Sequence, residues 1–279
     1  MTGKLTDVLT RKKYRIGVAL SGGGIKGLCH AGVLKALDEY GVRIDIISGV
    51  SAGAIVGAMY ADGYTPDEIA ALFEDMSFRQ MTKLQIPDGG IFRIDSFERF
   101  LKKHLRAKTF EELKIPLRMV ATDLDKGESV VFMHGELIPP IIASSSVPIL
   151  FSPKIINGVH YVDGGVLKNF PVSTIRDECQ TVIGINASPL VAREYKPSLM
   201  NVASRTYHFM FKSNILHDKE ICDLLIEPVE MGNYETFGVE KSREIFELGY
   251  KEAKKILKKC EREQQITVES EAFEKLFSR

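Results

Sequence analysis

The sequence predicts an α/β protein with a mainly parallel central sheet, and two patterns near its beginning carry this prediction. Short apolar runs at 16–20 and 44–47 are typical of buried strands. Each run is followed by a segment with apolar residues at helical spacing or with many small residues, at 28–40 and 52–60. Strands that alternate with helices in this way form parallel sheets whose faces are covered by the helices.

Helix starts can be read further along the chain. The capping box Thr65-Pro-Asp-Glu68 places proline at the first helical position, where its missing N–H costs nothing. Asp95-Ser-Phe-Glu98 opens a second helix in the same manner. The chain from Pro197 onward is expected to be mainly helical.

The remaining expected strands are short apolar stretches bounded by turn residues. They lie at 117–122, 130–133, 154–156, 159–162, 181–186 and 223–227. Asn157-Gly158 separates the third of them from the fourth, and this dipeptide is the strongest short signal for a hairpin. No linker rich in proline, glycine or serine divides the chain, so we expect one domain over 1–279.

Composition excludes several classes of function. The chain has 279 residues, with 37 Lys and Arg against 37 Asp and Glu. A net charge of zero provides no field that would attract a polyanion, so we expect no nucleic acid partner. The four cysteines lie far apart without a C-x-x-C pair, which argues against a zinc site. No other cluster of metal ligands is visible, and we expect neither a metal nor another cofactor.

The sequence also gives an expectation about location. No apolar run approaches the roughly 18 residues that are needed to cross a bilayer. Basic residues precede the apolar run 16–20, but that run is too short for the core of a signal peptide. We therefore expect a cytoplasmic protein.

Gly49-Val-Ser-Ala-Gly53 is a G-x-S-x-G motif between a predicted strand and a predicted helix. A sharp turn from strand to helix exposes the serine hydroxyl at the edge of the sheet, and glycine tolerates the crowding on either side. The motif therefore indicates a nucleophilic Ser51. The alternative is a serine in a small-residue turn that packing requires.

Gly22-Gly-Gly-Ile-Lys-Gly27 directly follows the first strand and matches G-x-G-x-x-G. One interpretation is a dinucleotide-binding loop, which needs an acidic residue at the end of the second strand. Asp45 has a suitable spacing but lies near the start of its strand. The other interpretation is that the glycine N–H groups bind a negative oxygen that forms at Ser51.

A serine nucleophile needs a base, and none of the six histidines has a context that marks it as one. Asp163-Gly-Gly follows the strand expected at 159–162, where a rigid strand can aim a carboxylate at a fixed point. His208 and His217 follow Asp163 in the chain order of an α/β-hydrolase triad. Against that fold, Ser51 follows only the second predicted strand.

Five segments of this sequence resemble motifs of the patatin-like phospholipases in their order and spacing. The resemblance includes the bacterial-type members of that family. The five segments are Ser21–Gly27, Gly49–Gly53, Ala143–Pro148, Tyr161–Gly165 and Asn169–Pro171. The resemblance covers about 16–190. It implies a three-layer α/β/α sandwich and a serine lipid acyl hydrolase with a Ser–Asp dyad and no histidine.

The resemblance also implies roles for single residues. Ser51 would be the nucleophile and Asp163 the general base. The backbone N–H groups of Gly22, Gly23 and Gly24 would form the oxyanion hole. The supporting residues would be Lys26, Gly49, Gly53, Gly164 and Gly165.

The resulting expectation is a phospholipase A, lysophospholipase or esterase that takes a lipid or small ester. The alternatives are a dinucleotide-binding protein that uses the loop Gly22–Gly27 and a non-catalytic lipid-binding regulator. The segment 191–279 would complete the domain with helices and influence lipid selection. Phe209 and Phe211 lie off the apolar stripe of the helix expected at 197–216. They would mark a transient contact with a membrane surface, a homodimer contact or a second core face.

Overall fold

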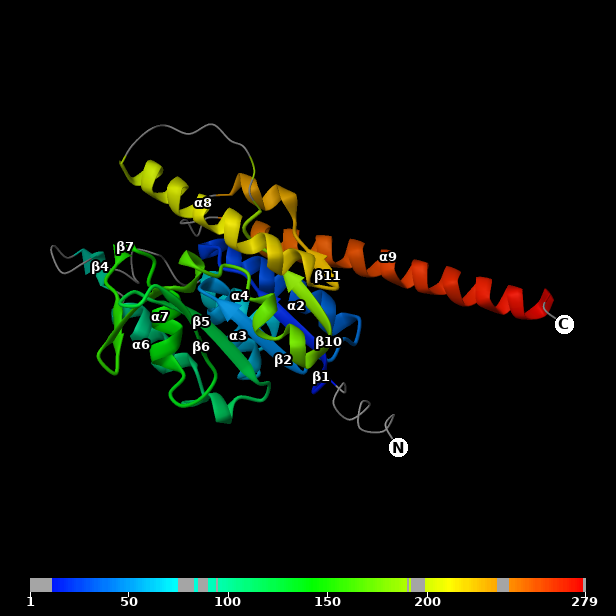
Figure 1. Ribbon diagram of the computed structural model, residues 1–279, viewed down its shortest axis with the longest axis horizontal. Coiled ribbons are helices and arrows are strands. Elements are labelled where there is room, and N and C mark those ends of the chain that lie inside the picture. Colours follow the sequence, from blue (N-terminus) through cyan, green and yellow to red (C-terminus); the bar gives the residue numbers. More distant parts are fainter. Residues whose placement is uncertain are drawn as a thin grey trace.

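The computed structural model describes residues 12–74, 83–84, 90–93, 95–189, 191, 199–234 and 241–277. Its centre is an eight-stranded sheet with the order β11-β10-β1-β2-β5-β9-β8, in which β6 also pairs with β5 (Figure 1). The strands of this sheet are β1 Tyr14–Leu20, β2 Ile46–Val50, β5 Leu117–Asp123, β6 Glu128–Phe132, β8 Lys154–Ile156, β9 Val159–Asp163, β10 Cys179–Ile185 and β11 Leu224–Ile226.

The sheet is parallel from β11 to β5 and antiparallel beyond it. The pairs β11–β10, β10–β1, β1–β2 and β2–β5 are parallel. The pairs β5–β6, β5–β9 and β9–β8 are antiparallel. This arrangement confirms the predicted α/β class with a mainly parallel central sheet.

Helices and turns cover both faces of the sheet, which gives three layers. The longer helices are α2 Leu28–Glu39, α3 Ala52–Ala61, α4 Pro66–Glu74, α6 Asp95–His104, α7 Ile138–Ser144, α8 Leu199–Glu220 and α9 Ser242–Phe277. Side chains of α2, α3, α4, α6, α7 and α9 share one core cluster with one face of the sheet. The opposite face is covered by the segment 170–175 and by Ile215 of α8.

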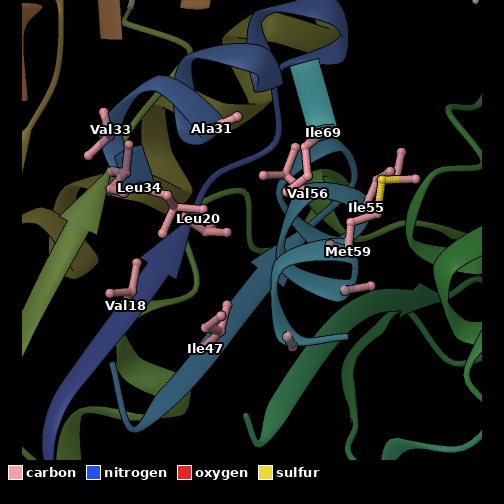
Figure 2. Close-up of a cluster of buried hydrophobic side chains, with 14 of the residues drawn as sticks. Val18, Leu20, Ala31, Val33, Leu34, Ile47, Ile55, Val56, Met59 and Ile69 are labelled. Carbon is pink, nitrogen blue, oxygen red and sulfur yellow. The ribbon is translucent and has the colours of Figure 1, made fainter. Parts of the chain in front are cut away.

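Successive side chains of the central strands point to opposite faces of the sheet and so enter two different hydrophobic clusters. Val18 and Leu20 of β1 and Ile47 of β2 point into the larger cluster, between α2 and α3 (Figure 2). Ala19 and Ile46 belong to the smaller cluster on the other face. Each large aliphatic side chain buried in this way contributes about 1.5–3 kcal/mol of transfer free energy. The two-residue period of a strand thus determines which side chains pack on each face of the sheet.

Local signals in the sequence account for several boundaries. Glu68 accepts hydrogen bonds from the Thr65 N–H (2.7 Å) and hydroxyl (2.9 Å), which confirms the predicted capping box of α4. Asn157 and Gly158 both have positive φ, 52° and 82°, as a tight hairpin turn between β8 and β9 requires.

Two features were not predicted. α7 begins with Ile138-Pro-Pro140, where prolines occupy its first turn. A second sheet contains β3 Lys83–Leu84, β4 Gly90–Arg93 and β7 Ile149–Phe151. Within the described ranges, no helix has the length and apolar character that crossing a bilayer would need.

The N-terminal part of α9 packs directly on α2, close to the sheet. A Cβ added to Gly32 would overlap the backbone carbonyl of Phe246, and one added to Gly249 would overlap the carbonyl of Cys29. The two helices therefore approach each other through a glycine on each side. That contact joins the segment expected to complete the domain, 191–279, to the expected core, 16–190.

We predict that Gly249→Ala lowers the free energy of unfolding by about 1–3 kcal/mol, because the two helix backbones must separate to admit a methyl group. Urea denaturation followed by circular dichroism measures the change. Lys251→Ala, on the exposed face of the same helix, is the matched control and should stay within about 0.5 kcal/mol of the wild type. An unchanged midpoint for Gly249→Ala would mean that α9 is not part of the cooperative unit.

Candidate active site

One edge of β5 brings the two predicted dyad residues together. Val50, the last residue of β2, pairs with Val120 of β5, and Asp163, the last residue of β9, pairs with Ala121. Since β6 pairs with both of these β5 residues, β2 and β9 must share the opposite edge. They run in opposite directions along it. Both strands therefore end at neighbouring positions, with Ser51 and Asp163 at their junction.

Ser51 occupies a strained turn between β2 and α3. Its backbone has φ 52° and ψ −119°, a conformation that costs a non-glycine residue about 1–3 kcal/mol. Its N–H donates to Ser144 Oγ (2.8 Å), and that hydroxyl donates to the Val120 carbonyl (2.6 Å). Ser144, at the end of α7, thus ties the serine turn to β5. Ser51 as a residue is only 7% exposed.

Glycines allow the backbones around this turn to approach each other. A Cβ on Gly49 would stand 2.5 Å from the carbonyl oxygen of Gly53. A Cβ on Gly53 would overlap the carbonyl of Leu20, and one on Gly164 would overlap the carbonyl of Val120. Three of the four predicted supporting glycines, Gly49, Gly53 and Gly164, therefore have a steric role.

Asp163 is fixed by its backbone and by its carboxylate. Its N–H donates to the Ser146 carbonyl (2.9 Å), and its carbonyl accepts from the Thr122 hydroxyl (3.1 Å). Its Oδ1 accepts from the Gly165 N–H (2.7 Å). The side chain is buried, and this hydrogen bond restricts the rotation of its carboxylate.

Helix α8 holds the loop that follows Asp163. Asn214 Nδ2 donates to the Gly165 carbonyl (3.1 Å), and Asn214 Oδ1 accepts from the Asn169 N–H (3.0 Å). One helical turn later, the buried Asp218 accepts from Lys168 Nζ (3.0 Å). Asn214 and Asp218 could not be predicted from the sequence, because their partners lie in another segment of the chain.

The loop Gly22–Gly27 is attached to two other segments. The Ser21 hydroxyl accepts from the Ala187 N–H (2.9 Å) and donates to the Gly22 carbonyl (3.0 Å). The Gly22 N–H donates to the Asn169 carbonyl (3.0 Å). Of the three expected oxyanion donors, the Gly22 N–H therefore already has an acceptor.

Gly23 and Gly24 are the remaining expected donors. Gly24 has φ 61° and begins the 3-10 helix η1 (Gly24–Gly27), which leads into α2. Within the described residues, no acceptor is found for the N–H of either glycine. The predicted supporting residue Lys26 is buried in the same turn.

His30 on α2 contacts the residue that precedes the glycine loop. Its side chain is fully buried, and its Nε2 lies 2.8 Å from the Ser21 carbonyl oxygen, to which the neutral ring donates. Burial lowers the pKa of His30 to about 4. This role could not be predicted from the sequence, because the surrounding residues show only that His30 lies on a helix.

The other interpretations find less support in the geometry. The described histidine side chains are His30, His104, His134, His160 and His217, and none of them hydrogen-bonds Ser51 or Asp163. The side chain of His208 lies outside the described residues. Asp45 precedes β2, where its carboxylate accepts from the N–H groups of Arg15 and Ile16 (3.0 Å each), at the strand end opposite to the one a ribose contact requires. Among the described residues, no group of His, Cys, Asp and Glu could hold a metal ion.

We predict that His30 makes the protein sensitive to acid. Since the folded pKa is about 4 and an unperturbed histidine titrates near ~6.5, the unfolded chain binds the proton more readily between these values. The stabilisation is complete above the unfolded pKa and is lost as pH falls towards the folded one. Between pH 7 and pH 5 this loss should be about 2 kcal/mol.

Urea denaturation of the wild type and of His30→Gln at both pH values measures this contribution. Glutamine keeps a donor for the Ser21 carbonyl but takes up no proton in this range. The variant should therefore lose about 2 kcal/mol less on acidification than the wild type. Equal losses in the two proteins would contradict a neutral, buried His30.

Comparison with known proteins places the chain in a family. The model of the patatin-like phospholipase family matches residues 18–175. The uncharacterised protein YqhO of Bacillus subtilis is 34% identical over 215 residues, which are 65% of this chain and 74% of that protein. Human patatin-like phospholipase domain-containing protein 6 is 26% identical over 292 residues, or 91% of this chain and 21% of that protein.

The match to a further relative likewise spans only part of that protein. An uncharacterised NTE family protein of Mycobacterium tuberculosis is 35% identical over 64% of this chain, and the match spans about half of its length (48%). The crystal structure of VipD from Legionella pneumophila has the same fold, with a TM-score of 0.53 and 16% identity over 88% of this chain and 67% of that one. The family match covers more than half of this sequence and contains both junction residues, so the chain belongs to the patatin-like phospholipase family.

Proposed function

We propose that this protein is a serine lipid acyl hydrolase, which releases a fatty acid from a phospholipid, a lysophospholipid or a neutral ester through an acyl-enzyme. The junction of β2 and β9 carries the proposal, because the two strands that lead to Ser51 and Asp163 end side by side there, and none of the described histidine side chains hydrogen-bonds either residue. The glycine loop adjoins the same junction, where a Cβ on Gly22 would stand 3.4 Å from the Ser51 Cβ. Membership of the family supports lipid esters as the substrate class.

The proposed reaction uses groups of this chain together with the ester and one water molecule. Asp163 accepts the Ser51 hydroxyl proton while Oγ bonds to the carbonyl carbon, and the π electrons move onto the carbonyl oxygen. The N–H groups of Gly23 and Gly24 donate to that oxyanion. When the intermediate collapses, the bond to the alcohol breaks and Asp163 protonates the leaving oxygen. Water then repeats these steps on the acyl-serine, which releases the acid and restores Ser51.

Aspartate is a weak base, so stabilisation of the oxyanion has to lower much of the barrier. Loss of one such donor typically costs about 3 kcal/mol in the transition state. The attachment of the loop to Ala187, Asn169 and His30 is therefore functional in this proposal, because donors that are already oriented need no reorganisation during the reaction.

Helix α8 offers a surface for contact with lipid. Val202, Phe209 and Leu216 are spaced by seven residues, so they follow one stripe of the helix, and all three are exposed. We include a transient membrane contact through this stripe in the proposal. A homodimer contact is the other use of such a stripe, and light scattering together with vesicle co-sedimentation separates the two. The side chain of Phe211 lies outside the described residues.

We predict that the protein hydrolyses short-chain p-nitrophenyl esters and that Ser51→Ala lowers the turnover by about 10³-fold or more. The melting temperature should stay nearly the same, since alanine removes only the hydroxyl. Ser129→Ala, on the exposed surface of β6, is the matched control and should keep the wild-type rate. Activity that survives in Ser51→Ala would remove this serine from the mechanism.

A second prediction separates the dyad from a triad. Asp163→Asn keeps the shape and the hydrogen bond from the Gly165 N–H but removes the proton acceptor. It should therefore reduce turnover nearly as far as Ser51→Ala. A double variant, His208→Ala with His217→Ala, should keep most of the activity. If the folded double variant is as inactive as Ser51→Ala, a histidine is the base and the dyad assignment is wrong.

A further inference from the structure

The side chain of Asn169 is buried without a hydrogen-bond partner. It is 1% exposed, and neither its Nδ2 nor its Oδ1 finds a donor or acceptor among the described residues. An unsatisfied buried amide costs about 1–3 kcal/mol, and native proteins retain few of them. Such a group is therefore a candidate for contact with a ligand.

The backbone of Asn169 is held firmly on both sides. Its N–H donates to Asn214 Oδ1 (3.0 Å), and its carbonyl accepts from the Gly22 N–H (3.0 Å). The next residue, Phe170, is fully buried with its ring against Gly184 of β10, where a Cβ would overlap the ring. Three contacts thus fix the position from which the unpaired amide projects.

That amide lies beside the nucleophile. A Cβ on Gly22 would overlap Asn169 Oδ1 and would stand 3.4 Å from the Cβ of Ser51. The amide and the serine therefore flank the same glycine. A rotation about χ2 exchanges the oxygen and the NH2 group of an asparagine, so either can face this point.

We propose that the Asn169 side-chain amide is an oxyanion donor, which replaces the Gly22 N–H that its own backbone carbonyl engages. This inference rests on the proposed function. Nδ2–H donates to the carbonyl oxygen of the ester as that oxygen gains the electron pair from the C=O bond. No bond to Asn169 forms or breaks. The oxygen returns the electron pair on collapse, and the amide is left as it was.

This role accounts for the unpaired amide and compensates for the engaged Gly22 N–H. The amide has no partner among the described residues because its acceptor is the substrate oxygen. The site retains three donors, Gly23, Gly24 and Asn169, although Gly22 no longer contributes. A donor that acts on the developing charge is worth about 10²–10³ in turnover and little in ground-state binding.

Two variants test the proposal with a soluble p-nitrophenyl ester. Asn169→Leu removes the donor and keeps the volume, and Asn169→Ala removes both. Each should lower kcat by about 10²–10³-fold with little change in KM. The melting temperature of Asn169→Leu should not fall, since no hydrogen bond of this side chain is lost. If only the alanine variant is slow, the side chain acts through packing and the proposal is overturned.

Pre-steady-state kinetics identify the oxygen that Asn169 contacts. An oxyanion forms during both acylation and deacylation, so the burst rate and the later steady rate should both fall in Asn169→Leu. Slow acylation with unchanged deacylation would indicate a contact with the leaving alcohol and would overturn the proposal. A raised KM with unchanged kcat would do the same, because it would indicate substrate binding alone.

The outcomes also distinguish this inference from the proposed function. An active wild type with an equally active Asn169→Leu would overturn the role of Asn169 and leave the Ser51–Asp163 dyad in place. A folded wild type that neither hydrolyses esters nor forms an acyl-enzyme would overturn both.

Discussion

One edge of strand β5 pairs with two strands that run towards each other, and the candidate site lies where both of them end. β2 reaches this edge from one side and β9 from the other, with partners at the adjacent residues Val120 and Ala121. Neither strand can continue without displacing the other, so the chain has to turn away after each. One turn contains Ser51, and the other begins at Gly164, where no side chain fits against the Val120 carbonyl.

The surrounding hydrogen bonds maintain this arrangement at some cost in stability. Ser144 connects the strained Ser51 turn to β5, Ser21 joins the glycine loop to the end of β10, and His30 supports it from α2. The neutral His30 and the unpaired amide of Asn169 both reduce the stability that an apolar packing could reach. Sites that are oriented for reaction commonly carry such costs, which the large hydrophobic core offsets.

Local signals predicted the parts of the site that depend on local geometry. Ser51 is a candidate from the sequence because a turn from strand to helix imposes glycines at fixed spacing, and Asp163 because it follows a hairpin strand. The pairing of β9 with β5 joins distant segments, so the sequence could place the two residues at strand ends but could not show that the ends meet. The same limit applies to the Gly22 N–H, whose acceptor belongs to Asn169. α7 has only a weak pattern, and the role of Ser144 was missed with it.

Trapping the nucleophile with a covalent inhibitor decides whether the junction activates Ser51 through Asp163. The protein would be treated with an alkyl fluorophosphonate, and mass spectrometry would locate the adduct and follow its rate of formation. The account predicts one adduct, on Ser51, that forms far more slowly in a folded Asp163→Asn variant. An adduct on a different serine, or the wild-type rate in Asp163→Asn, would contradict it.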